Sequence, residues 1–167
     1  MRSGRAAASL VTAIAAVAAL SGCGMFGGPS ELECMERAMY FESNRSSRDG
    51  MVAVGSVVMN RVESGRYPRS VCGVVGQKNQ FARGVMKRRM DARSAPMIRS
   101  AAVSVLRGER HPMIGDAQFF HTASYRAKYD NMHYVLTTGG NAFYERRKPE
   151  LVRQPFPLPP IEGITGR

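Results

Sequence analysis

Apolar residues recur at helical spacing through the first two thirds of the chain. A capping box at residues 30–33 opens a helix that ends near Glu42, because the apolar positions between them follow the three- and four-residue period. Residues 49–62 are apolar on most faces, which predicts a central, buried helix. A short helix is expected at residues 70–76, and another at 97–107 follows a proline and stops at a glycine.

After Pro112 the pattern changes to short β-branched and aromatic segments, which are typical of strands. Three strands are predicted, at Ala117–His121, Tyr134–Thr138 and Ala142–Tyr144. The Gly139-Gly140 pair suits a tight turn between the last two. Helices followed by a small antiparallel sheet predict an α+β fold.

The chain begins with the layout of a secretory signal peptide, expected to cover residues 1–22. A short basic start precedes an alanine-rich apolar core that is too short and too weakly hydrophobic for a stable membrane span. The residues Leu20-Ser21-Gly22-Cys23 resemble a bacterial lipobox, which implies lipidation of Cys23 as the first mature residue. Gly24 resembles the signal for routing to the outer membrane, so we expect a periplasmic lipoprotein anchored there. Ordinary cleavage nearby with an incidental Cys23 is the alternative.

The mature chain divides by composition into three segments. Residues 23–30 form a short tether, and residues 31–148 form one domain that is large enough for a single core. Residues 149–167 contain five prolines, so we expect a tail that runs extended, either on the surface or away from it.

The formal net charge of +11 favours an anionic partner such as cell wall, lipid headgroups or nucleic acid. Export argues against nucleic acid, and the densest basic cluster, at residues 87–89, has no interleaved aromatic residues. The three histidines show no short ligand spacing, so we expect neither a metal nor another cofactor.

Cys34 and Cys72 remain as an even pair if Cys23 carries lipid. In an oxidising compartment such a pair favours a disulfide, which contributes about 4 kcal/mol in the chain-entropy model. Two buried free thiols are the alternative.

Glu42 stands where one apolar helix ends and a second buried helix follows. A carboxyl group in such a partly desolvated place has a raised pKa, as a proton donor near neutral pH requires. A solvated acid at a helix end is the competing interpretation.

Several sequence blocks resemble the SleB/CwlJ cell wall hydrolases, in order and spacing, across about residues 32–146. The blocks are Ala38–Glu42, Gly50–Val62, Tyr67-Pro68, Val71–Val75, Gln80-Phe81, Phe119–His121 and Gly140–Tyr144. The resemblance implies a lysozyme-like, lytic-transglycosylase-like helical lobe with a small antiparallel sheet. It also implies cleavage of the glycosidic bond after N-acetylmuramic acid, with Glu42 as the catalytic residue.

One carboxyl group suffices if the sugar's own 6-hydroxyl attacks the anomeric carbon, whereas attack by water requires a second acid. Asp49, Asp130 and Glu145 are the candidates for that acid. The residues expected to line the substrate cleft are Gln80, Phe81, His121, Tyr129 and Asn141.

The chain departs from the family pattern at three places. Residues 43–46 stand where the family usually has Ala-Arg-Gly-Glu, so the second acid of that motif is lost. Ala142 replaces a histidine, and Tyr129 replaces a frequent tryptophan. These changes leave the proton donor in place and alter its surroundings.

Two alternatives to a glycosidase stay open in the sequence. The protein could be a lipid-anchored module that binds peptidoglycan with little or no catalysis. Cys72, His121 and His133 also occur in the order of a known family of cell wall cysteine peptidases, in which a thiolate beside an imidazole attacks an amide.

Overall fold

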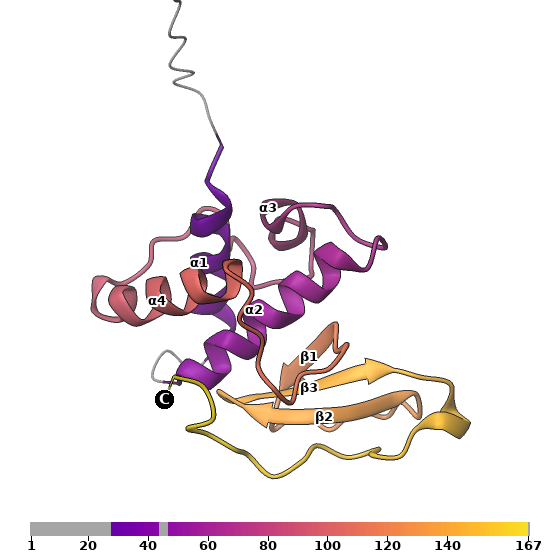
Figure 1. Cartoon of the computed structure of the whole chain (residues 1–167). Coiled ribbons are helices and arrows are strands. Elements are labelled where there is room, and N and C mark those ends of the chain that lie inside the picture. Colours follow the sequence, from indigo (N-terminus) through magenta and orange to yellow (C-terminus); the bar gives the residue numbers. More distant parts are fainter. Residues whose placement is uncertain (1–27, 44–46, 167) are drawn as a thin grey trace, which may run out of the picture.

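The computed structural model describes residues 28–43 and 47–166, which form a helical lobe resting on a small sheet (Figure 1). The helices are α1 (Glu31–Glu42), α2 (Arg48–Glu63), α3 (Val71–Val75) and α4 (Ala95–Leu106), with single 3₁₀ turns at Ala92–Ser94 and Pro149–Leu151. The strands are β1 (Phe119–Thr122), β2 (Met132–Thr138) and β3 (Asn141–Arg146). The predicted α+β architecture is confirmed.

Helix α1 begins where the capping box predicts, because the Ser30 hydroxyl accepts a hydrogen bond from the Glu33 N–H at 3.1 Å. Helix α2 begins at Arg48, one residue before the predicted start. The Ser47 hydroxyl accepts from the Gly50 N–H at 2.9 Å and so satisfies a donor of its first turn. Residues 49–58 are all buried, which confirms α2 as the central helix, packed against α1 and α4.

The three strands are antiparallel, in the order β1-β3-β2. Gly139 and Gly140 connect β2 to β3 with φ values of 56° and 82°, a backbone conformation that favours glycine. Strand β1 begins at Phe119 instead of Ala117. The carbonyls of Ala117 and Gln118 accept hydrogen bonds from Asn60 and Arg61 of α2 and are therefore not available to the sheet.

A disulfide joins Cys34 of α1 to Cys72 of α3 with an S–S distance of 2.05 Å. The predicted pairing is therefore confirmed, and the alternative of two free thiols is wrong. The bond ties α3 to the outer end of α1, and the Glu31 carboxylate at that end accepts the Val71 N–H at 2.6 Å. The position of α3 is thus held covalently and by a charge-assisted hydrogen bond.

The proline-rich tail runs on the surface along the free edge of β2 (Figure 1). The Gln154 carbonyl accepts from the Tyr134 N–H, and the Ile161 N–H donates to the Thr137 carbonyl, each at 2.9 Å. Two carboxylates fasten its end: Asp49 accepts from the Ile164 and Thr165 N–H groups at 2.8 and 2.6 Å, and Glu162 accepts from the Gly139 N–H at 2.7 Å. The tail therefore packs against the rest of the domain, although the composition of the chain changes at residue 148.

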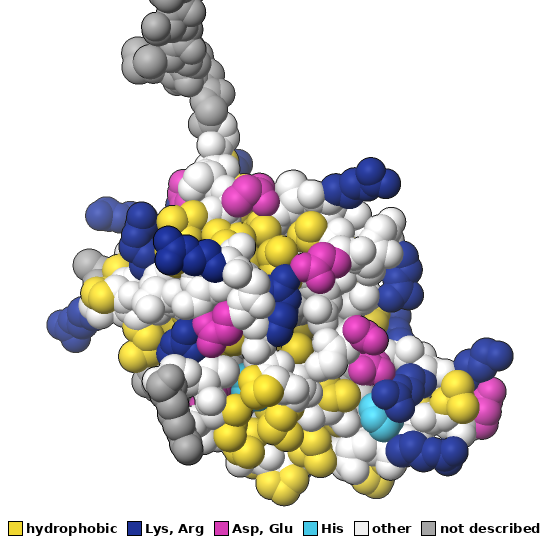
Figure 2. Space-filling view, viewed as in Figure 1, with side chains coloured by type: hydrophobic (Ala, Val, Ile, Leu, Met, Phe, Trp, Pro, Cys, Tyr) yellow, Lys and Arg dark blue, Asp and Glu magenta, His cyan; other side chains and the backbone are white. Residues whose placement is uncertain are grey.

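The signal peptide, most of the tether and Cys23 lie outside the described residues. Within the described part, none of the helices has the length and apolar character that crossing a bilayer requires. Basic side chains are spread around the face shown in Figure 2 with acidic side chains between them, so the positive charge on that face is not concentrated in one block.

Candidate active site

Glu42 is the last residue of α1, and its half-buried side chain turns toward the loop that follows α3. One carboxylate oxygen accepts a hydrogen bond from the Ala82 N–H. Ser43 ends the helix, because both its N–H and its hydroxyl bond to the Met39 carbonyl. Glu42 is therefore held at a helix end with one oxygen tied to protein backbone.

The surroundings of Glu42 raise the pKa of its carboxyl group above the usual value. Burial is the largest cause, since it disfavours the charged form. The Ala82 N–H and the positive charge of Arg61 oppose this shift and reverse only part of it. A carboxyl group in this balance carries a proton at higher pH than a solvated glutamate, as a general acid must.

Arg61, near the end of α2, is the cation whose charge lowers the pKa of Glu42. Only 3 % of its surface is exposed. Its guanidinium carbon lies 5.3 Å from the ring centres of Tyr67 and Phe81, and its Nε donates to the Gln118 carbonyl at 2.8 Å. Its Nη1 atom is buried and has no hydrogen-bond partner among the described residues. A buried charged donor without a partner among the described residues is rare, and it leaves this nitrogen able to bind an acceptor.

Asn141, the first residue of β3, connects the sheet to the C-terminal end of α1. Its buried side-chain amide donates to the backbone carbonyl of Glu42. An α-helix leaves its last carbonyls without internal partners, and this bond satisfies one of them. The contact makes Asn141 a residue that positions Glu42, while its predicted contact with substrate stays a prediction.

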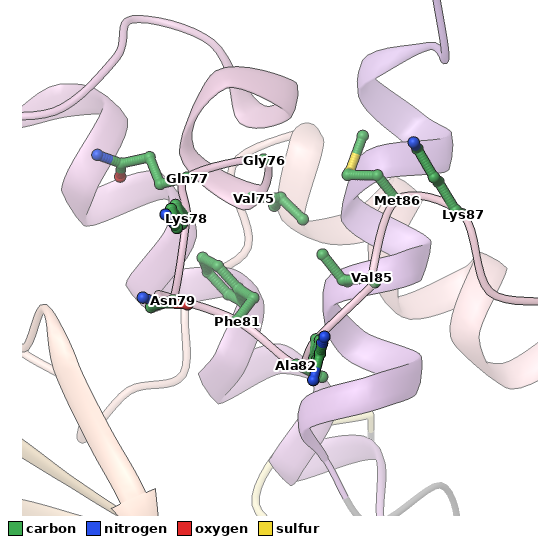
Figure 3. A pocket seen from close by; sticks show the side chains of 12 residues that line it. Val75, Gly76, Gln77, Lys78, Asn79, Phe81, Ala82, Val85, Met86 and Lys87 are labelled. Carbon is green, nitrogen blue, oxygen red and sulfur yellow. The ribbon is translucent and has the colours of Figure 1, made fainter.

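Two grooves are lined by neighbours of Glu42. The loop groove, of about 550 Å³, is bounded by residues 75–87, and Figure 3 shows Phe81 and Val85 within it. The arginine groove, of about 510 Å³, lies between the end of α2 and the sheet. Its lining residues are Arg61, Arg66, Tyr67, Gln77, Asn79, Gln80, Phe119, Phe120, Tyr144 and Arg146.

The two grooves are continuous, because Gln77 and Asn79 line both. Glu42 lines neither, but its hydrogen-bond partner Ala82 lines the loop groove and its neighbour Arg61 lines the arginine groove. The carboxyl group is therefore linked to each groove through one neighbouring residue.

The predicted cleft residues occupy different parts of the surface around these grooves. Gln80 is exposed and lines the arginine groove. Phe81 is buried in the core and presents part of its ring to the loop groove. Tyr129 is 70 % exposed and lies in a smaller groove of about 240 Å³, which shares Tyr144 with the arginine groove.

His121 belongs to an aromatic cluster on the sheet. Its Nε2 lies 2.7 Å from the Tyr134 hydroxyl, and its ring contacts those of Tyr125 and Tyr144. It lines none of the three grooves described above and reaches them only through Tyr144. The structure thus brings Phe81 and Asn141 close to Glu42. It places Gln80 in the arginine groove and His121 outside the grooves.

Sequence reasoning overlooked Ala82, Arg66 and Arg146. Ala82 acts through its backbone N–H, which no side-chain pattern reveals. Arg66 follows α2 and Arg146 ends β3, so they reach the same groove only when the sheet packs under the helices. Arg61 stands near the end of an apolar helix, but its closeness to Glu42 depends on how the two helices pack.

Two of the candidate second acids are engaged elsewhere. Asp49 holds the C-terminal tail, and Glu145 forms an ion pair with Arg147 at 2.8 Å. Asp130 is exposed and has no structural link to Glu42. Residues 44–46, where the family usually carries its second acid, lie outside the described residues.

The cysteine-peptidase alternative requires a free thiolate at Cys72. That sulfur is bonded to Cys34, so it is not available as a nucleophile. In the part of the chain that the structure describes, no group of three or more His, Cys, Asp or Glu side chains is arranged to hold a metal ion.

A helical lobe on a small sheet, with one half-buried acid beside a long polar groove, defines the lysozyme-like class of glycosidases. The family model for cell wall hydrolases matches residues 45–144, and the chain belongs to this family. The match begins just after Glu42, so the assignment of the acid depends on its geometry and on the preceding sequence blocks.

Two solved structures are similar to this chain. The catalytic domain of the germination-specific lytic transglycosylase SleB from Bacillus anthracis is 25% identical, with a TM-score of 0.57 over 71% of this chain and 98% of that one. The catalytic domain of the Bacillus cereus SleB protein is 23% identical, with a TM-score of 0.57 over 74% of this chain and 100% of that one, and shows the fold. Among curated proteins, none matches this sequence.

Proposed function

We propose that this protein cleaves the glycan strands of peptidoglycan as a lytic transglycosylase, with Glu42 as its acid and then its base. The observation that carries the proposal is a half-buried carboxyl group with a raised pKa, whose neighbours Ala82 and Arg61 line two adjoining grooves. Membership of the cell wall hydrolase family and similarity to a lytic transglycosylase domain support the substrate and the reaction.

The reaction needs one proton donor that becomes a proton acceptor. Protonated Glu42 donates to the glycosidic oxygen as the bond between that oxygen and the anomeric carbon breaks. The resulting carboxylate then takes the proton of the muramic acid 6-hydroxyl while its oxygen bonds to the anomeric carbon. The products are a sugar with a free hydroxyl and an anhydro-muramyl end, and Glu42 is protonated again.

The neighbours of Glu42 suit both halves of this cycle. Burial favours the neutral acid that starts the reaction, whereas Arg61 and the Ala82 N–H stabilise the carboxylate that forms in the middle. Asn141 holds the backbone of Glu42 and so limits the movement of its carboxyl group. In the arginine groove, Gln80 supplies hydrogen bonds for a sugar. In the smaller groove, the exposed ring of Tyr129 offers a flat apolar face.

We also propose that the mature protein is a lipoprotein of the outer membrane that acts in the periplasm. The arrangement of basic start, apolar core and Cys23 supports export and lipidation. The disulfide between Cys34 and Cys72 suits an oxidising compartment. Metabolic labelling with a radioactive fatty acid tests the anchor: label should appear in the wild type and be absent from Cys23→Ser.

Mass spectrometry of fragments released from purified sacculi tests the reaction. The chain without its first 22 residues should release muropeptides with anhydro ends. Glu42→Gln should lower the rate by at least about 100-fold, because general acid catalysis contributes that much or more. Circular dichroism and binding to sacculi show whether this variant is folded.

Each other outcome contradicts the proposal in a distinct way. Reducing ends would mean that water attacks, and a second acid would have to be found. Free peptides would mean a peptidase. Binding to sacculi without release of fragments, by wild type and variant alike, would mean a wall-binding module that lacks catalysis.

A further inference from the structure

The arginine groove contains positive charge that the cleavage reaction itself does not use. Three of its lining residues are arginines, Arg61, Arg66 and Arg146, and its lining contains no aspartate or glutamate. None of the three forms an ion pair within the described part of the chain. A neutral sugar chain gives no reason for such a concentration of guanidinium groups.

The three arginines of the groove use only part of their hydrogen-bonding capacity within the described part of the chain. The Nη1 donor of Arg61 is buried and has no partner among the described residues. Arg66 is exposed and donates from Nη2 to the Gln118 side chain at 2.9 Å, so only part of its guanidinium group is engaged. Arg146 is also exposed; its guanidinium carbon lies 4.5 Å from the ring centre of Phe119, and the group hydrogen-bonds to the Tyr144 side chain, which leaves further N–H groups for a ligand.

We infer that the arginine groove binds a carboxylate carried on the side arm of muramic acid, and this inference rests on the proposed function. Guanidinium groups match carboxylates in charge and shape, and Arg61 supplies a desolvated donor while Arg66 and Arg146 supply exposed ones. The carboxylate has two sources in peptidoglycan: the stem peptide in intact strands, and the lactyl group itself once an amidase has removed the peptide.

Binding of this carboxylate selects which glycosidic bond of the strand is cleaved. Anchoring the side arm of one muramic acid fixes which glycosidic oxygen lies beside Glu42, because Arg61 adjoins both the groove and the acid. Binding energy gained away from the reacting atoms is thereby used to orient the substrate.

Binding to three kinds of sacculi tests this inference without depending on catalysis. Glu42→Gln is the background, and the sacculi are intact, amidase-stripped, or chemically amidated so that their carboxyl groups are blocked. We expect amidation to weaken binding of the background protein by about five-fold or more, since several charge-assisted contacts are lost. The ratio between intact and stripped sacculi assigns the source of the carboxylate.

Two double variants separate a site from general attraction. Arg66→Gln with Arg146→Gln should lose most of the difference between intact and amidated sacculi. Arg107→Gln with Arg153→Gln removes the same charge from exposed positions that line none of the grooves, and should keep that difference.

Equal losses in the two double variants would overturn the inference, because the arginines would then attract the wall only as surface charge. Binding that is insensitive to amidation would overturn it as well. Release of fragments by the wild type is measured separately, so failure of the glycosidase proposal is not confused with failure of the carboxylate site.

Discussion

At the scale of single residues, the environment of a carboxyl group decides what it does in this protein. Glu109 forms hydrogen bonds to Arg48 at 2.8 and 2.7 Å, and these hold its pKa below the usual value. Among the described residues no guanidinium group bonds to Glu42, and burial raises its pKa although Arg61 is near. The pKa of the same side chain is thus lowered in one place and raised in the other.

Glu42→Gln should increase stability near neutral pH, because the buried carboxylate no longer has to be desolvated. The pKa of Glu42 in the folded state lies above its unfolded value of 4.5. The wild type therefore loses stability as the pH rises from 4.5 through the folded-state pKa. Chemical denaturation between pH 4 and pH 8 measures this. The two proteins should converge at the acidic end, and a constant difference would contradict the raised pKa.

Cleavage should fall as the pH rises through the pKa of Glu42, because only the protonated acid donates. Arg61→Gln should move this fall to higher pH, since the positive charge that lowers the pKa of Glu42 is removed. The pH dependence of kcat/KM measures the shift, with a thermal melt to confirm folding. A profile that weakens without moving would mean that Arg61 only supports the fold.

At the scale of secondary-structure elements, the site forms where the end of α1 meets the start of β3. Asn141 links the two by its bond to the Glu42 carbonyl. Nearby, Gly50 of α2 lies so close to Gly139 of the β2–β3 turn that an added Cβ at either position would come within 2.5 Å of the other backbone. Helices and sheet are therefore joined at the ends of elements, by the Asn141 bond to Glu42 and by the close approach of Gly50 and Gly139.

Asn141→Ala should lower kcat by about ten-fold or more and leave KM nearly unchanged, because the acid is displaced while the grooves persist. The variant should also lose about 1 kcal/mol of stability, the usual worth of such a hydrogen bond. Steady-state kinetics on solubilised glycan strands and urea denaturation provide the two numbers. A change confined to KM would instead assign Asn141 to substrate binding.

At the scale of the whole molecule, the C-terminal tail holds the helical lobe against the sheet. It hydrogen-bonds to the free edge of β2, and an exposed edge of this kind is a site for aggregation unless it is covered. Burial alone would raise the pKa of Asp49, but the Thr165 hydroxyl and the N–H groups of Ile164 and Thr165 hold it below the usual value. The tail is thus part of the folded domain.

Removal of residues 153–167 should destabilise the protein by about 3 kcal/mol or more, because it exposes the β2 edge and leaves Asp49 without its donors. The folded-state pKa of Asp49 lies below its unfolded value of 3.8. The part of the stabilisation that Asp49 contributes is therefore present above pH 3.8 and is lost as the pH falls through the folded-state pKa. Thermal melts at pH 7 and pH 3 measure it.

The point variant Asp49→Asn, in the full chain, is the matched control for the truncation. It keeps the β2 edge covered and should show a smaller loss that shrinks with acidification in the same way. A truncated chain as stable as the full one would contradict the role of the tail in joining lobe and sheet.

The sequence by itself determined the secondary-structure elements and pointed to a partly desolvated Glu42, because these features depend on local patterns. Capping residues, helical periodicity and a glycine pair predict α1, α2 and the β2–β3 turn within a residue or two, and the two apolar helices around Glu42 predict its desolvation. Cysteine parity predicts the disulfide.

Only the tertiary structure decided what surrounds Glu42, because its neighbours come from distant parts of the chain. The Ala82 N–H, Arg61 and Asn141 lie on a loop, a helix and a strand, and no local pattern states that they converge. The arginine groove and the attachment of the tail likewise arise from the packing of the sheet under the helices. Contacts between residues far apart in sequence are set by the whole packing arrangement.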